Sequence, residues 1–404
     1  MDVTPHARTG TPHLEGVRIL DLTRILAGPY CSLLLGEMGA DVIKVEPPGT
    51  GDHSRRAGSS GARDGLHYLA WNFHRRSITL NMYEEEGRTI FRKLVEGADV
   101  VLENFRPGVM ARMGFGYDDL KQIKPNIILT SVSGYGQNTS FSSYPAHNTV
   151  VLSFTGLMDL NGFADGPPLR PPGSMGDAVA GTYAALGTLA ALYRKQANGT
   201  GEHVDIAMMD CLVGQIAYDL ANYIVTGEEA TRKGNGSADR AFHNVYRTRD
   251  GWIYIQADLE NQWKRLAETM GKSELLDDPR FRTEAGRVNH KEELDAIAQE
   301  WVKDRARDDV FHLLAGAGVP ASPVNTVADV AAHPHLKERG MLHEVEHPGH
   351  GKLPALTPRI RFEDTPSRKP AYPPMLGENN EEVYREMLGY DESTLAGLKE
   401  RGII

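Results

Sequence analysis

The chain has 404 residues, of which 40% are hydrophobic and 24% are charged, and its formal net charge is −10. This composition is ordinary for a globular protein long enough for two domains, and the negative charge argues against a general nucleic-acid binder. Its two cysteines, Cys31 and Cys211, exclude a disulfide scaffold and fit a reducing compartment.

The first 200 residues alternate short apolar runs with amphipathic stretches. The apolar runs predict strands at 17–22, 41–45, 100–102 and 127–132. The amphipathic stretches predict helices at 28–38 and 84–96. This alternation predicts an α/β fold with a doubly wound parallel sheet, and loops at the carboxyl ends of such strands usually bind ligands.

Two longer helical patterns follow, at 178–195 and 207–226, before the character of the chain changes. A polar, glycine-bearing loop at 232–237 leads to a hairpin at 245–255, which we expect to turn at Asp250-Gly251. Helices are then predicted at 261–270, 290–304 and 308–316. We therefore expect the N-terminal part of a large domain at 1–224, a small α+β domain at 225–315, and a linker and C-terminal part at 316–404.

One carboxylate occupies an informative place. Asp177 follows Gly176 and directly precedes the apolar run that begins at Ala178, so it should lie at a helix N-terminus. The helix dipole and the free N–H groups there favour the ionised carboxylate, which can act as a nucleophile. Aspartate is also a common N-cap residue, so a purely structural role is the alternative.

Several well-known signatures are absent from the sequence. There is no Gly-x-Gly-x-x-Gly after a strand, no Walker loop, no zinc-ligand spacing and no Gly-x-Ser-x-Gly elbow, so we expect no metal and no tightly bound cofactor. Residues 1–8 lack the apolar core of a secretory signal, and the apolar stretch 178–193 is shorter than the roughly 20 residues of a membrane span. We therefore expect a cytoplasmic protein that binds no membrane.

Two turns with polar residues or glycines directly follow predicted strands. Asn104 lies in the turn 103–108, where its side chain can bond a ligand or its own turn. Gly134, Tyr135 and Gly136 follow the next strand. Ligand-binding loops should therefore gather at one edge of the sheet.

These pieces together resemble the class III coenzyme A transferases, the family of formyl-CoA transferase and carnitine CoA-transferase. The matching stretches are 16–29, 35–46, Asp52 with Arg55, 72–80, 103–108, 113–114, 133–136, 156–158, 176–177, 318–320 and 376–378. They cover nearly the whole chain in order. The resemblance is closest to members that pass CoA between dicarboxylic acids such as succinate and glutarate.

The resemblance implies an interlocked homodimer of ring-like chains, with the small domain inserted into the large one. It implies that Asp177 is the nucleophile, which forms an aspartyl anhydride and then an aspartyl-CoA thioester. Substrates would be a CoA thioester and a small carboxylic acid. The positions that match the family's CoA site are Arg24, Ile25, Leu80, Asn104, Phe105 and Arg112.

Further residues are candidates for substrate or oxyanion contacts. Backbone N–H groups at Gly134 and Gly136, beside Tyr135, could steady an oxyanion, as could the loop 234–236. Arg170 or Arg240 could hold a second carboxylate.

His147 keeps a second function, that of a racemase, open. Related transferases commonly show Gly-Tyr-Asp where this chain has Ala146-His147-Asn148, and the sister α-methylacyl-CoA racemases show Gly-His-Asp. A racemase would use His147 and Asp177 as its two bases. The context of Asp177 resembles the transferases, in which His147 would line the acyl pocket. A non-catalytic acyl-CoA-binding protein is the third alternative, which the retained Asp177 and Asn104 argue against.

Overall fold

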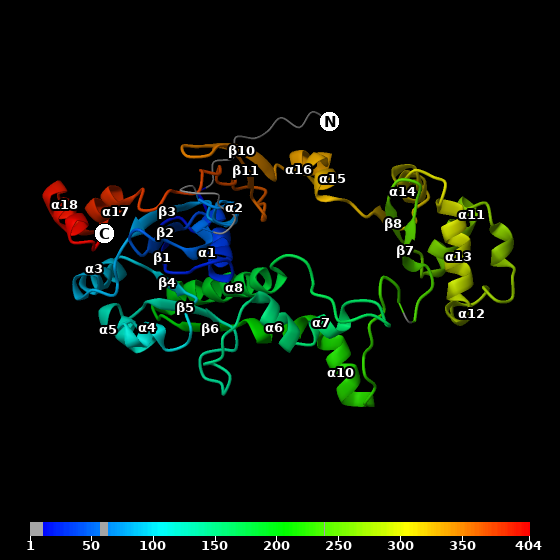
Figure 1. Ribbon diagram of the computed structural model, residues 1–404, viewed down its shortest axis with the longest axis horizontal. Helices are drawn as coiled ribbons and strands as arrows, with labels where there is room; N and C mark the ends of the chain where they lie inside the picture. Colours follow the sequence, from blue (N-terminus) through cyan, green and yellow to red (C-terminus); the bar gives the residue numbers. More distant parts are fainter. Residues whose placement is uncertain (1–10, 57–63, 238) are drawn as a thin grey trace. The chain divides into compact units, whose positions relative to one another are not determined.

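The structure is a computed structural model that describes residues 11–56, 64–237 and 239–404. The chain divides into two compact units (Figure 1). The large unit comprises Met1–Leu157, Pro171–Ala221 and His335–Ile404, and the small unit comprises Met158–Arg170 and Asn222–Pro334.

The large unit is built on a six-stranded parallel sheet, which confirms the predicted α/β class. Its strands are β1 (Arg18–Asp21), β2 (Asp41–Glu46), β3 (Arg75–Thr79), β4 (Val100–Glu103), β5 (Ile128–Ser133) and β6 (His203–Ala207). They lie in the order β3-β2-β1-β4-β5-β6, and all neighbouring pairs are parallel. The order changes direction between β1 and β4, which is where open α/β sheets bind ligands.

The structure contains two sheet strands, β3 and β6, that the apolar runs do not predict. β3 carries Arg75, whose guanidinium is buried and paired with Asp21 of β1 at 3.1 Å. β6 is an edge strand and carries His203 and Asp205. Polar side chains interrupt the apolar pattern of both strands, so apolar runs did not predict them. The fold accommodates these charges because they have ion-pair partners or face solvent.

Helices cover both faces of this sheet. The large unit includes α1 (Ala27–Glu37), α2 (Leu66–Trp71), α3 (Glu85–Glu96), α4 (Val109–Arg112), α5 (Tyr117–Ile123), α6 (Asn148–Phe154), α8 (Met175–Asn198), α9 (Met208–Val213), α17 (Asn380–Leu388) and α18 (Glu392–Glu400). Helices α3, α5, α17 and α18 share one apolar core with the sheet, whereas α1 and α8 pack together on the other face.

The C-terminal end of the chain completes the large unit. Val383 and Tyr384 of α17 are fully buried in the same core as Phe91 of α3. A hairpin of β10 (Leu342–His347) and β11 (Gly351–Leu356) also belongs to this unit. Three short helices join the units, namely α7 (Leu157–Leu160), α10 (Ala217–Thr226) and α16 (Pro334–Glu338).

The structure shifts the start of one predicted helix and divides another. Helix α8 begins at Met175, so Asp177 is its third residue. The helix predicted at 207–226 is interrupted, because β6 runs to Ala207 and a short 3₁₀ turn at Gly214–Ile216 separates α9 from α10.

The small unit contains a three-stranded sheet of β7 (His243–Arg247), β8 (Trp252–Gln256) and β9 (Ala321–Pro323). The antiparallel pair β7 and β8 confirms the predicted hairpin. Its helices are α11 (Glu260–Thr269), α12 (Glu284–Asn289), α13 (Lys291–Val302), α14 (Arg307–Gly316) and α15 (Val327–Ala332). The unit runs past the predicted boundary at 315 because β9 pairs with β8.

Candidate active site

The loops that follow β1 and β4 lie beside each other where the strand order changes direction. Asn104, after β4, reaches across to Arg24, after β1. Its Oδ1 accepts a hydrogen bond from the Arg24 N–H, and its Nδ2 donates one to the Arg24 carbonyl oxygen, both at 2.8 Å. The Asn104 amide therefore fixes the neighbouring loop, a use that neither sequence alternative foresaw.

A cavity of about 380 Å³, here named the Asp177 pocket, lies at this edge of the sheet. It brings together most of the residues predicted for the site. Those that line it are Arg24, Ile25, Asn104, Phe105, Gly134, His147 and Asp177.

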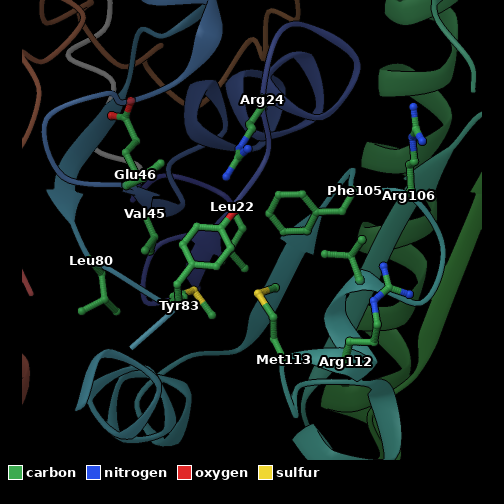
Figure 2. A pocket seen from close by; sticks show the side chains of 13 residues that line it. Leu22, Arg24, Val45, Glu46, Leu80, Tyr83, Phe105, Arg106, Arg112 and Met113 are labelled. Atoms are coloured by element: carbon green, nitrogen blue, oxygen red, sulfur yellow. The ribbon is translucent and has the colours of Figure 1, made fainter. Parts of the chain in front are cut away.

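A second cavity of about 420 Å³, here named the Leu80 pocket, lies in the same unit (Figure 2). Its predicted residues are Arg24, Leu80, Phe105 and Arg112, and its remaining wall is largely apolar. Arg24, Phe105 and Arg106 line both pockets. The Arg24 guanidinium carbon lies 5.1 Å from the centre of the Phe105 ring, so cation and ring together form a shared wall.

Asp177 is half-buried in the first turn of α8. Within the described ranges of the chain, its carboxylate has no hydrogen-bond or ion-pair partner. Burial raises the pKa of Asp177 from its ordinary 3.8 to about 6. The carboxylate is therefore available for chemistry and is less strongly held in its charged form than a capping aspartate would be.

Asn148 takes the capping role that Asp177 does not. Its Oδ1 accepts the Gly176 N–H at 2.8 Å, and its Nδ2 donates to the Gly173 carbonyl oxygen at 3.2 Å. Ser174, at the N-cap position, makes no side-chain capping bond. An amide from another helix thus secures the start of α8 beside Asp177.

The three residues after β5 are placed differently from one another. Gly134 lines the Asp177 pocket, and a Cβ there would lie 2.1 Å from the Ala146 Cβ, so only glycine lets the two segments meet. Tyr135 is buried against Phe154 and does not line the pocket. The Gly136 N–H already donates to Ser133 Oγ at 3.0 Å, so it is not the free oxyanion donor that the sequence suggested.

The other candidate anion ligands belong to the small unit. Arg240 is paired with Asp258 at 2.7 Å, and residues 234–236 line a separate cavity within that unit. Arg170 is exposed at the end of the unit's first segment. None of them lines the Asp177 pocket.

Among the lining residues that were not predicted for the site, three have ionisable side chains. Arg106 could have been predicted from the sequence, because it lies in the stretch 103–108 that resembles the family. His53 is adjacent to Asp52, another matching residue, whereas no pattern singles out Tyr144.

The described part of the chain has neither a candidate metal site nor a candidate membrane-spanning helix. Among residues 11–56, 64–237 and 239–404, no three His, Cys, Asp or Glu side chains are grouped so that they could bind a metal ion. Over the same ranges, every helix falls short of the length and apolar character that crossing a bilayer requires.

Comparisons with known proteins identify the family of the chain. The model of CoA-transferase family III matches residues 14–380. Human (Homo sapiens) succinyl-CoA:glutarate CoA-transferase is 34% identical over 392 residues, which cover 97% of this chain and 90% of that protein. Succinyl-CoA–D-citramalate CoA-transferase of Chloroflexus aurantiacus is 36% identical over 395 residues, which cover 97% of this chain and 98% of that protein.

A solved structure extends the likeness to the fold. The crystal structure of a CAIB/BAIF family protein from Brucella suis matches with a TM-score of 0.85 and 35% identity, over 94% of this chain and 100% of that one. The relatives described above are named CoA-transferases, so the racemase alternative is not favoured. The chain belongs to CoA-transferase family III and is a CoA-transferase.

Proposed function

We propose that this enzyme transfers CoA from a succinyl-CoA-type thioester to a dicarboxylic acid, with Asp177 as the nucleophile. The observation that carries the proposal is the Asp177 carboxylate itself, which lines a pocket and has no partner within the described ranges. The names of the human and Chloroflexus relatives support succinyl-CoA as donor and a dicarboxylic acid such as glutarate as acceptor.

The proposed chemistry exchanges one thioester for another. The Asp177 carboxylate attacks the thioester carbonyl carbon and expels CoA thiolate, which leaves a mixed anhydride. The thiolate attacks the Asp177 carbonyl carbon, forms an aspartyl-CoA thioester and releases the donor acid as its carboxylate. The acceptor carboxylate attacks this thioester in turn, and the returning thiolate attacks the acceptor carbonyl carbon and frees Asp177. Bonds of similar energy are exchanged, so the reaction needs no ATP.

The two pockets divide the acyl-CoA between them in this proposal. The apolar Leu80 pocket receives the adenine, and Arg24, Arg106 and Arg112 supply positive charge for the phosphates. Within residues 11–56, 64–237 and 239–404, neither Arg106 nor Arg112 has an ion-pair partner. The pantetheine arm then passes Arg24 and Phe105, which line both pockets, and brings the thioester to Asp177.

Two residues of the Asp177 pocket have proposed roles toward the acyl group. His147 precedes α6 and contacts the acceptor carboxylate. The Gly134 N–H remains the candidate donor for the thioester oxyanion.

We also propose that the enzyme is a homodimer. Helix α8 exposes an apolar stripe of Tyr183, Leu186 and Tyr193, with exposed fractions of 45%, 57% and 75%. Their spacing places them on one face, opposite the buried alanines of the same helix. A second copy of the chain is the partner that the family resemblance implies for such a face.

One incubation in D₂O tests the transfer against racemisation. Purified enzyme is mixed with succinyl-CoA, a 2-methylacyl-CoA and a panel of carboxylic acids, and the products are read by mass spectrometry. New CoA thioesters without deuterium are expected, and they identify the acceptor. Deuterium at the α-carbon without new thioesters would contradict the proposal and give His147 and Asp177 the roles of racemase bases.

A further inference from the structure

Two buried charges lie close to the Asp177 pocket without lining it. Lys44, on β2, and Asp52, in the loop after β2, form an ion pair at 3.0 Å, and both side chains are fully buried. Burying two charges costs desolvation free energy, and apolar side chains often replace such a pair without loss of stability. A contribution to stability therefore does not by itself explain why the fold contains this buried ion pair.

Both partners hold the backbone of one short loop, 23–25. Lys44 Nζ donates to the Thr23 carbonyl oxygen at 2.8 Å, and Asp52 Oδ1 accepts the Ile25 N–H at 3.1 Å. Between them, Asn104 binds both backbone polar groups of Arg24. Side chains from other segments therefore fix three consecutive residues.

Ile25 needs such support. Its φ is +68°, in the left-handed region that a β-branched residue avoids. Its side chain is 41% exposed and lines the Asp177 pocket, so packing in the core does not hold this conformation. A strained residue in a pocket wall persists only where its surroundings determine it.

The charge of Asp52 is kept across the working pH range. Burial alone would raise the pKa of Asp52, but the Lys44 ammonium and the N–H groups of Ser54 and Ile25 outweigh it and hold the pKa well below its ordinary value. The acceptor for the Ile25 N–H is therefore always an ionised carboxylate, which binds more strongly than a neutral oxygen.

We propose that Lys44 and Asp52 are positioning residues that hold Ile25 in its left-handed conformation and so shape the wall on which acyl-CoA binds. The ligand in this inference rests on the proposed function, whereas the loop contacts do not. Neither residue takes part in the transfer chemistry.

The first test removes the pair without leaving a lone charge. Lys44→Met/Asp52→Leu should fold, because apolar side chains replace both charges. The probe is CoA, with its Kd measured by calorimetry, and the second readout is hydrogen exchange of the Ile25 amide. We expect Kd to rise about tenfold and the Ile25 amide to exchange faster. Thr188→Val, which removes the buried hydrogen bond between Thr188 and Thr130 in the same unit, is the control that should change neither.

A second background separates positioning from general damage. Glycine adopts positive φ without steric cost, so Ile25→Gly removes the backbone strain at this position. The variant therefore no longer needs Lys44 and Asp52 to hold the left-handed conformation. In this background, Lys44→Met/Asp52→Leu should weaken CoA binding less than about threefold. Equal weakening in both backgrounds, or unchanged exchange of the Ile25 amide, would overturn the inference. A wild-type enzyme that binds no CoA would instead refute the proposed function, while the exchange readout would still decide the inference.

A matched pair covers the case in which the apolar variant does not fold. Lys44→Met/Asp52→Asn and Lys44→Met/Asp52→Ala both remove the two charges, but only asparagine keeps an oxygen for the Ile25 N–H. The asparagine variant should retain slower Ile25 exchange and tighter CoA binding than the alanine variant. Identical behaviour of the two variants would show that the contact to Ile25 does not matter.

Discussion

At the scale of single residues, two effects compete for the charge of Asp177. The N-terminus of α8 favours the carboxylate, whereas burial disfavours it, and burial dominates because the pKa rises to about 6. The sequence correctly placed Asp177 at a helix start but predicted the wrong direction for its pKa. Only the fold shows how much water reaches this side chain, and that Asn148 caps the helix in its place.

The raised pKa predicts the acid limb of the reaction. Asp177 must be ionised to attack, so kcat/KM should fall about tenfold per pH unit below a midpoint near pH 6. A pH–rate profile measured with succinyl-CoA checks this, and a midpoint near pH 4 would contradict it.

The same pKa has a consequence for stability with a defined sign. A carboxyl whose pKa is raised on folding stabilises the fold when protonated, and this contribution is lost between about pH 4 and pH 6. Asp177→Asn cannot ionise, so its Tm should exceed that of the wild type at pH 8 and match it more closely at pH 5. Thermal unfolding of both proteins at pH 5 and pH 8 measures the difference in Tm. A difference in Tm that is the same at both pH values would contradict a raised pKa of Asp177.

At the scale of elements, close backbone approach decides how the pocket is assembled. Gly134, at the end of β5, meets Ala146 in the segment that carries His147 and Asn148. The sequence predicted Gly134 as an oxyanion candidate, because its backbone N–H lies in a glycine turn directly after a strand. It could not foresee the packing role, since the contact joins segments that only the fold brings together.

A compensating pair of substitutions tests this contact. Gly134→Ala would place two Cβ atoms 2.1 Å apart, so we expect a loss of about 1–3 kcal/mol in the free energy of unfolding, together with a fall in kcat/KM. Gly134→Ala/Ala146→Gly removes the clash and should recover most of both. Urea unfolding and steady-state kinetics provide the readouts. A double variant as impaired as the single one would place the role of Gly134 elsewhere.

The elements also show what a sequence pattern can and cannot predict. Apolar runs located β1, β2, β4 and β5, because buried parallel strands are nearly continuous in apolar residues. The arginines of β3 concealed that strand, because only the fold shows their partners, Asp41 on the neighbouring β2 and Asp21 on β1. Likewise, the positive φ of Ile25 leaves no trace in composition, because isoleucine is the residue least expected there.

At the scale of the whole molecule, the exposed apolar stripe of α8 predicts association. Light scattering should give about twice the chain mass of 44.4 kDa for the wild type. Leu186→Asp places a charge in the stripe and should shift the mass toward that of one chain. Leu313→Asp changes a leucine of similar exposure on α14 and is the control. A monomeric wild type would contradict the proposed homodimer. An equal change in mass for both substitutions would show that the apolar stripe of α8 is not the interface.

In the proposed mechanism, the Asp177 carboxylate itself carries the acyl and CoA groups in turn. Enzyme turning over succinyl-CoA with glutarate labelled by ¹⁸O in its carboxylates provides the most direct measurement, because the acceptor oxygen that bridges to Asp177 stays there when the new thioester leaves. After digestion, mass spectrometry should find ¹⁸O in the carboxylate of Asp177. A fully active enzyme whose Asp177 remains free of label would contradict the covalent account.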